Sequence, residues 1–99
     1  MKFTSKQRAY LRSQAQTIDP VVYVGKDGYS DGVRDALDQA LGCHELVKVR
    51  FQNSKDQIKE ISSRLASGTE SDIVATTGFT TVFFRQNENP EDRIYDLRF

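Results

Sequence analysis

Residues 20–51 read PVVYVGKDGYSDGVRDALDQALGCHELVKVRF, and this stretch decides the fold. It begins with a β-branched run over residues 21–24, which predicts a short strand buried on both faces. A glycine-rich loop follows, and apolar residues then recur at helical spacing over residues 30–42. Residues 45–51 alternate apolar and basic side chains, which predicts a second strand with one buried and one solvated face.

Capping residues set the expected ends of the helices. Ser30 or Asp31 should cap the helix of residues 30–42, because short polar side chains accept hydrogen bonds from the first free N–H groups. Gly42 should end this helix, and Gly68 should end a later one, because glycine adopts the left-handed conformation that follows many helices.

The rest of the chain adds one helix before this stretch, and a helix and a hairpin after it. Thr4 followed by Gln7 is a capping box, which predicts a first helix over residues 4–16. The other expected elements are a helix over residues 54–67 capped by Asn53 or Ser54, and strands over residues 71–77 and 80–86 joined by Gly78-Phe79. The order α-β-α-β-α-β-β indicates an α/β fold, a small mixed β-sheet with packed helices.

Length and composition indicate one small globular domain. The chain has 99 residues, of which 37% are hydrophobic and 28% charged. We expect a single domain over residues 1–86, and a tail over residues 87–99 that is either loosely attached or a packed extension. There is no apolar run long enough for a membrane span or a secretory signal, and the one cysteine, Cys43, fits a reducing cytoplasm. We therefore expect a cytoplasmic protein.

Basic residues gather in the first third of a chain whose net charge is zero. Residues 1–34 carry six basic and three acidic side chains, a net charge of +3. On a helical projection the cations of the first helix lie opposite its apolar residues, so one face is buried and the other is basic. The cations are Lys2, Lys6, Arg8 and Arg12, and the apolar residues are Phe3, Tyr10, Leu11, Ala15 and Ile18.

Several chemistries are disfavoured by the residues present. A calcium loop over residues 27–38 would need an oxygen ligand where Tyr29 stands and a helix where a strand is predicted. The chain also lacks the glycine and lysine pattern of a nucleotide-binding loop. Cys43 and His44 are too few for a structural zinc site or a nucleophilic centre, so we expect Cys43 to be a small buried residue and His44 a capping or surface residue. An enzyme is not expected.

The loop Gly25-Lys26-Asp27-Gly28 suits an anion better than a metal. Gly25 and Gly28 let the backbone turn sharply and leave room for a ligand. The next helix directs its free N–H groups toward this loop, and Lys26 adds a cation. A Gly-x-x-Gly loop at a helix N-terminus can clamp a nucleic-acid backbone, although such a loop is more often only a turn.

The whole chain resembles a known family. PVVYVGKDGYSDGVRDALDQAL followed by HELVKVRF, with GFTTVFFR near the end, is similar to the CRM domain (chloroplast RNA splicing and ribosome maturation) in its bacterial YhbY-type form. The resemblance covers about Lys6 to Arg85. It implies a fold similar to the C-terminal domain of translation initiation factor three, RNA binding, and association with precursors of the large ribosomal subunit.

The resemblance also implies a binding surface. It assigns the Gly-x-x-Gly loop to residues 25–28, the basic helix to Lys6, Arg8 and Arg12, and the basic strand positions to Lys48 and Arg50. We predict a monomeric, non-enzymatic protein that binds ribosomal RNA without a cofactor, metal, membrane or small-molecule substrate. The alternative is a protein-interaction adaptor that does not contact RNA. The candidate RNA-binding residues are Lys2, Lys6, Arg8, Arg12, Gly25, Lys26, Asp27, Gly28, Lys48 and Arg50.

Overall fold

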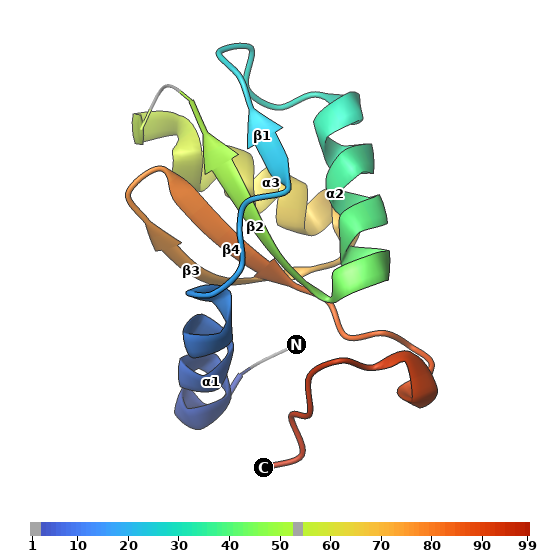
Figure 1. The fold of residues 1–99 in the computed structure, drawn as a ribbon. Helices are drawn as coiled ribbons and strands as arrows, with labels where there is room; N and C mark the ends of the chain where they lie inside the picture. The colour runs from blue at the N-terminus through green and yellow to red at the C-terminus, as the bar shows by residue number, and fades with distance from the viewer. Residues whose placement is uncertain (1–2, 53–54) are drawn as a thin grey trace.

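The computed structural model of the chain describes residues 3–52 and 55–99, and Figure 1 shows their arrangement. These residues form a four-stranded sheet with helices packed against it. The helices are α1 (Ser5–Ala15), α2 (Asp31–His44) and α3 (Ile58–Thr69), and the strands are β1 (Val22–Val24), β2 (Leu46–Phe51), β3 (Asp72–Thr77) and β4 (Thr80–Phe84). The predicted order α-β-α-β-α-β-β and the mixed α/β class are confirmed.

The strands lie side by side in the order β1-β2-β4-β3. β1 runs parallel to β2, with Val22 opposite Val49, while β2 and β3 are both antiparallel to β4. The last two strands form the predicted hairpin, whose turn contains Gly78 at a φ of 58°. A register shift between Ile73 and Ala75 marks a bulge in β3, which is an edge strand.

The two faces of the sheet carry two separate hydrophobic cores. Because side chains alternate along a strand, Val47, Val49 and Phe51 of β2 point to the face that α2 and α3 cover. Leu46 points to the other face, where it joins Val82 and residues of α1 in a second cluster. In Figure 1, α2 and α3 lie together on one side of the sheet and α1 lies at its lower end. Part of the second face is therefore left open.

Two features of the middle of the chain differ from the prediction. The first strand was expected to be buried on both faces, but β1 pairs only with β2, and Tyr23 is 56% exposed. Its short apolar run is therefore an edge strand, with one face on the α2 and α3 core and one in solvent. Cys43 was expected to be buried and is exposed. The buried stripe of α2 contains Leu37 and Leu41, and a residue two places after Leu41 lies about 200° around the helix.

Two helices end later than predicted. α2 runs past Gly42 to His44, and Glu45 follows at a φ of 61°; α3 runs past Gly68, and Glu70 follows at a φ of 53°. A glutamate thus takes the positive-φ position that we had expected glycine to fill. The other end of α3 also differs, since a 3₁₀ turn at Lys55–Gln57 precedes it and its N-cap, Gln57, makes no side-chain cap hydrogen bond. The predicted caps Asn53 and Ser54 lie outside the described residues.

The two other predicted caps are present. Thr4 and Gln7 form the capping box of α1, and the Ser30 hydroxyl accepts a hydrogen bond from the Val33 N–H at the start of α2. Gln7 has a second role, because its Nε2 donates to the Leu97 carbonyl at 2.9 Å. The N-terminal helix is thereby joined to the end of the chain.

The C-terminal tail (residues 87–99) packs against the rest of the molecule. The buried Glu45 carboxylate accepts hydrogen bonds from the backbone N–H groups of Asn87 at 2.5 Å, Ile94 at 2.7 Å and Tyr95 at 3.1 Å. Leu97 is buried in the α1 core, and the Tyr95 ring makes an edge contact with Tyr10 of α1. The tail therefore packs against α1 and completes the hydrophobic cluster on the face of the sheet that α2 and α3 do not cover.

Candidate nucleic-acid interface

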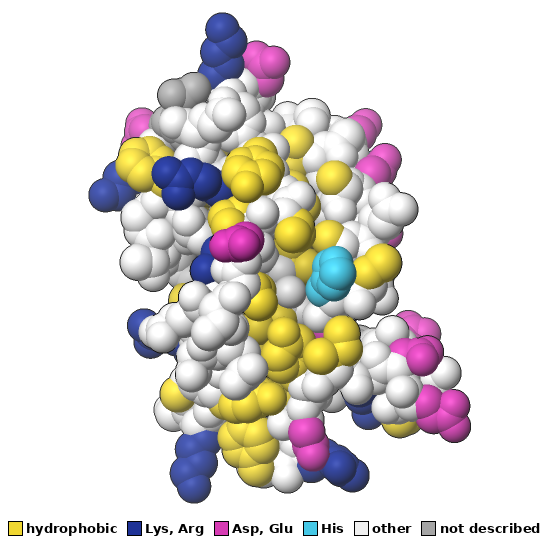
Figure 2. All heavy atoms as spheres, in the orientation of Figure 1, with side chains coloured by type: hydrophobic (Ala, Val, Ile, Leu, Met, Phe, Trp, Pro, Cys, Tyr) yellow, Lys and Arg dark blue, Asp and Glu magenta, His cyan; other side chains and the backbone are white. Residues whose placement is uncertain are grey.

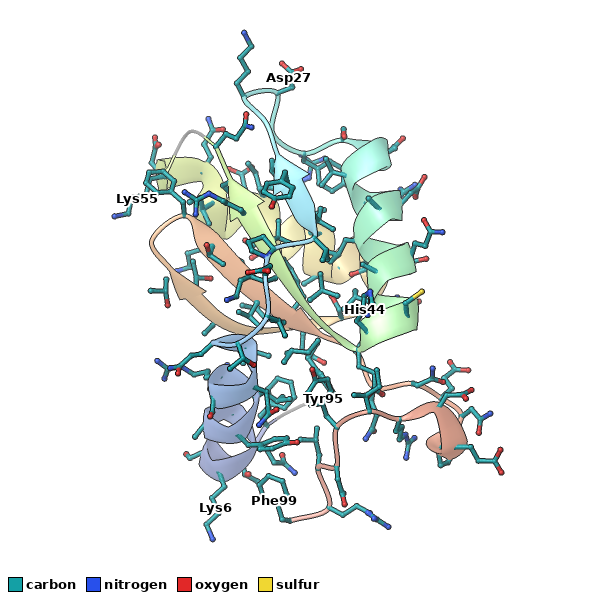
Figure 3. All side chains as sticks on the ribbon, in the orientation of Figure 1. Lys6, Asp27, His44, Lys55, Tyr95 and Phe99 are labelled. Carbon is teal, nitrogen blue, oxygen red and sulfur yellow. The ribbon has the colours of Figure 1, made fainter. Side chains whose placement is uncertain are left out.

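The basic face of α1 divides into residues with different surroundings. Lys6 is exposed near the outer end of the helix, as Figure 3 shows. Arg12 lies at the other end, where α1 approaches the sheet, and it lines a groove there. Lys2, which was also predicted to bind RNA, lies outside the described residues.

Arg8 differs from the other cations of α1 because its guanidinium is hydrogen-bonded within the fold. Nη1 donates to the Val74 carbonyl at 2.6 Å and to the Ile73 carbonyl at 3.2 Å, and the group lies 5.3 Å from the centre of the Phe3 ring. These carbonyls belong to the bulged part of β3, which has no strand partner on its outer side. Arg8 therefore fastens α1 to the edge of the sheet, a role that the helical projection could not reveal.

The Gly-x-x-Gly loop forms a tight turn beyond the end of β1. The Gly28 N–H donates to the Gly25 carbonyl at 3.0 Å, and Gly28 has a φ of 71°, which only glycine adopts without strain. A Cβ at Gly28 would also lie 3.4 Å from Ile61 Cδ1. Lys26 and Asp27 at the tip are exposed, and Figure 3 shows Asp27 projecting from the top of the molecule. The side chains of the loop tip therefore face solvent.

The N-terminus of α2 attracts an anion less strongly than the sequence suggested. The Ser30 hydroxyl already accepts the Val33 N–H at 3.1 Å, and Asp31 lies in the first turn. Arg34 pairs with Asp35 at 3.0 Å and with Asp31 at 3.5 Å, and its hydrogen bond to Asp35 raises the pKa of its guanidinium. Because carboxylates already offset the positive helix end, the loop's attraction for phosphate depends on the backbone of residues 25–28 and on Lys26.

The uncovered part of the sheet forms a basic surface, which we call the open sheet face. It contains Tyr23 of β1, Lys48 and Arg50 of β2, Thr80 of β4 and Thr77 of β3. Tyr23 is opposite Arg50, Arg50 is opposite Thr80, and Thr80 is opposite Thr77, so the four side chains follow one line across the sheet. Figure 2 shows basic and hydrophobic side chains mixed over this region. The predicted solvated face of β2 is therefore present.

Where the open sheet face meets α1, the surface is hollowed into a groove of about 410 Å³. Arg12 of α1 and Lys48 of β2 both line it, and none of the described lining residues is acidic. Within residues 3–52 and 55–99, the side chains of Arg12, Lys48 and Arg50 make no hydrogen bond or ion pair. We call this hollow the Arg12–Lys48 groove; its full lining is Arg12, Ala15, Gln16, Lys48, Ala75, Thr77, Thr80 and Val82.

The predicted site residues are spread along the molecule, whose longest dimension is 38 Å. Lys6 lies at one end and the Gly-x-x-Gly loop at the other, as the labels of Lys6 and Asp27 in Figure 3 show. The structure brings Arg12 and Lys48 together in one groove, and places Arg50 between that groove and the loop end of the sheet. Sequence reasoning missed Tyr23, Gln16, Thr77 and Thr80 as neighbours of these cations.

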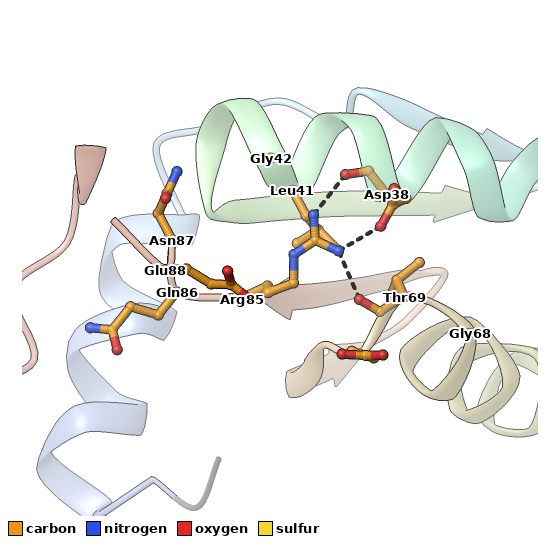
Figure 4. A pocket seen from close by; sticks show the side chains of 10 residues that line it. Asp38, Leu41, Gly42, Gly68, Thr69, Arg85, Gln86, Asn87 and Glu88 are labelled. Carbon is orange, nitrogen blue, oxygen red and sulfur yellow. Dashed lines mark hydrogen bonds and ion pairs between the residues drawn. The ribbon is translucent and has the colours of Figure 1, made fainter. Parts of the chain in front are cut away.

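A larger hollow, of about 630 Å³, lies between α2, the end of α3 and the start of the tail (Figure 4). Arg85 occupies it: Nη1 donates to Asp38 Oδ1 at 2.6 Å and to the Thr69 carbonyl at 2.7 Å, and Nη2 donates to the Asp38 carbonyl at 3.0 Å. The charge of Arg85 is thus matched by Asp38, and Glu70 and Glu88 also line the hollow. The carboxylates around this hollow make it unfavourable for phosphate. The hydrogen bonds of Arg85 instead join α2, α3 and the end of β4.

Two further findings concern the described part of the chain as a whole. Among these residues no group of three or more histidine, cysteine, aspartate or glutamate side chains is arranged to hold a metal ion. Nor does any of their helices combine the length and apolar character that a membrane crossing requires.

Comparisons with known proteins agree with the fold and with the motifs. The chain is 34% identical over 86 residues to "Probable RNA-binding protein YqeI" of Bacillus subtilis, covering 86% of this chain and 90% of that protein. It is 31% identical over 86 residues to a protein of Haemophilus influenzae named "RNA-binding protein", covering 86% of this chain and 87% of that one. The solution structure of protein SAV1595 from Staphylococcus aureus, described as a candidate RNA-binding protein, matches with a TM-score of 0.79 and 33% identity, over 96% of this chain and 100% of that one.

A model of the CRS1/YhbY (CRM) domain matches residues 3–85. This range contains every described candidate residue, and it includes the Gly-x-x-Gly loop and the HELVKV stretch on which the resemblance rested. The resemblance drawn from the sequence is therefore confirmed, and the chain belongs to the CRS1/YhbY (CRM) domain family.

Proposed function

We propose that this protein binds RNA, and that its RNA is ribosomal RNA in precursors of the large ribosomal subunit. The observation that carries the proposal is the Arg12–Lys48 groove, where two cations from different elements meet without an acidic neighbour among the described lining residues. Arg50 extends this positive region across the open sheet face. Relatives similar over most of the chain are named RNA-binding proteins, which supports the same conclusion.

Positive charge is concentrated locally although the net charge is zero. Phosphates attract cations whose charge is not already neutralised by a carboxylate, and Arg34, Arg85 and Arg98 are all paired in that way. Arg12, Lys48 and Arg50 are not paired within the described residues. The open sheet face therefore offers unpaired positive charge to a polyanion, and this charge helps to steer the approach of RNA.

The candidate residues have distinct roles in this proposal. Arg12, Lys48 and Arg50 contact phosphates along the sheet, and Lys6 and Lys26 extend the contact toward the two ends of the molecule. Gly25 and Gly28 let the loop backbone approach the RNA, with Asp27 beside Lys26 at the tip. Arg8 positions α1, and so positions Arg12, while its own guanidinium is held by β3. Phosphate contacts position a protein without reading bases, so we infer a preference for RNA structure over sequence.

We infer that the protein acts by binding and not by catalysis, as a cytoplasmic monomer. Sedimentation of a cell lysate through a sucrose gradient tests the ribosomal part of the proposal. We expect the protein to migrate with particles slightly lighter than the mature large subunit, and to be released by salt or by RNase. Migration at the top of the gradient with another protein would support an adaptor instead and would contradict the proposal.

One observation supports the alternative function, a protein-interaction adaptor that does not contact RNA. An apolar hollow of about 420 Å³ lies near the tail, lined by Ile18, Asp19, Val21, His44, Leu46, Ile94 and Tyr95. However, Leu97 of the RIYDLRF segment is buried in the protein's own core, and Tyr95 packs on Tyr10. Tyr95 and Leu97 of this segment are thus held within the protein's own fold and are not free to dock a partner, which favours RNA.

A further inference from the structure

We propose that the open sheet face is a stacking platform for unpaired bases, so that the RNA it takes contains a single-stranded segment. This inference rests on the proposed RNA binding and narrows it to a class of RNA. It is carried by two exposed aromatic residues near Arg50: Tyr23, which lies opposite Arg50 on β1, and Phe79, which precedes the residue opposite Arg50 on β4.

Tyr23 provides the first ring. Its side chain is 56% exposed, although it belongs to a strand, because β1 is an edge and α1 does not reach it. Its hydroxyl donates to the Pro20 carbonyl at 3.2 Å, so the ring is held in place at the surface. A ring that is already fixed loses little conformational freedom when a base stacks on it.

Phe79 provides the second ring, at the turn between β3 and β4. It is 41% exposed, and its carbonyl accepts a hydrogen bond from the Phe51 N–H at 2.8 Å, which ties the turn to the end of β2. The Lys55 ammonium lies 5.9 Å from the ring centre, so a cation accompanies this ring as well. Phe79 precedes Thr80, which lies opposite Arg50 on the side away from Tyr23.

The pattern of rings and cations fits a single strand. Unpaired RNA presents bases and phosphates in alternation, and proteins that bind it combine aromatic rings with a positively charged path. Here Tyr23, Arg50 and the turn at Phe79 follow one another across the sheet, and Lys48 and Arg12 continue the positive path along the groove. A duplex keeps its bases stacked inside and would leave both rings without a partner.

Fluorescence anisotropy tests this inference with two RNAs of equal length, one unpaired and one a perfect duplex. Wild-type protein should bind the unpaired RNA more tightly. Tyr23→Ala and Phe79→Ala should each weaken that binding by about 5- to 150-fold, the range found when a stacking ring is removed. Tyr23→Phe keeps the ring and should retain binding within about threefold. Ile94→Ala removes a side chain of similar exposure (57%) from the tail and should change nothing.

The salt dependence of RNA affinity distinguishes the contribution of the aromatic rings from that of the charged side chains. Tyr23→Ala should leave the slope of log K against log salt unchanged, whereas Arg50→Gln should reduce its magnitude by roughly 0.7, the value for one phosphate contact on a single strand. As a measurement that needs no variant, 2-aminopurine placed in the unpaired RNA should lose fluorescence on binding if it stacks on a ring.

The outcomes are distinguishable. Equal or tighter binding of the duplex, or unchanged affinity in Tyr23→Ala and Phe79→Ala, overturns the stacking platform and leaves the proposed RNA binding intact. An unchanged 2-aminopurine signal on saturation by wild-type protein overturns it as well, even if the variants do not fold. Failure of the folded wild-type protein to bind either RNA contradicts the proposed function itself, and this inference with it.

Discussion

Replacing Glu45 with alanine should release the C-terminal tail and destabilise the protein by about 3 kcal/mol. The Glu45 side chain is 1% exposed, and its carboxylate accepts three backbone hydrogen bonds, from Asn87, Ile94 and Tyr95. An unsatisfied buried donor costs about 1–3 kcal/mol, and we take the lower value for each because a released tail can hydrate its own N–H groups.

Urea and thermal unfolding followed by circular dichroism measure this loss. For a domain of this size, about 3 kcal/mol corresponds to a fall in Tm of roughly 12–24 °C. Glu88→Ala is the matched control, because it removes an exposed carboxylate from the tail and should leave Tm unchanged within about 3 °C. Glu45→Gln should give an intermediate loss of stability. Its amide keeps one acceptor oxygen but places an NH₂ group where a backbone N–H needs an acceptor. A loss below about 0.5 kcal/mol for Glu45→Ala would refute the view that this carboxylate holds the tail.

Three further predictions concern α1, the loop and the tail. Arg12→Ala should weaken RNA binding with little change in Tm, whereas Arg8→Ala should cost about 1 kcal/mol in urea unfolding, because it removes the hydrogen bonds from α1 to β3; equal stability of the two variants would contradict the structural role of Arg8. Gly28→Ala should destabilise by about 1–2 kcal/mol because of its positive φ, and Gly25→Ala, which has space for a Cβ, by less. Burial, with smaller contributions from Tyr10 and Glu45, raises the pKa of Tyr95 above its ordinary value of 10. Its contribution to stability is therefore complete below pH 10 and is lost as the pH rises through 10 toward the folded-state pKa, so Tyr95→Phe should lessen the loss of stability measured at alkaline pH.

The sequence contained enough information to predict the order of the elements and much of the binding surface. Capping residues such as Thr4 and Ser30 act on neighbours three residues away, so their effect can be predicted without knowing the fold. The alternation in β2 likewise placed Lys48 and Arg50 on a solvated face, because the period of a strand is fixed by backbone geometry. Local rules were sufficient for these features.

Features that depend on contacts between distant elements could not be predicted in this way. An apolar run such as residues 21–24 does not reveal how many strands will pair with it, so the exposure of Tyr23 was missed. Arg12 and Lys48 share a groove only because α1 packs against one end of the sheet. Glu45 is a charged residue between a helix and a strand, and its burial depends on tail residues more than forty positions later in the chain.

The salt dependence of RNA affinity in a triple variant tests the central claim most directly. With Arg12, Lys48, Arg50, Lys6 and Lys26 engaged on a single strand, log K of the wild-type protein should fall with log salt at a slope of roughly −3.5. Arg12→Gln, Lys48→Gln and Arg50→Gln combined should reduce the magnitude of the slope to roughly 1.4 and weaken binding strongly, while Tm stays near that of the wild type, because these side chains make no hydrogen bond or ion pair among the described residues. A triple variant with unchanged affinity and slope would contradict the assignment of RNA binding to this surface.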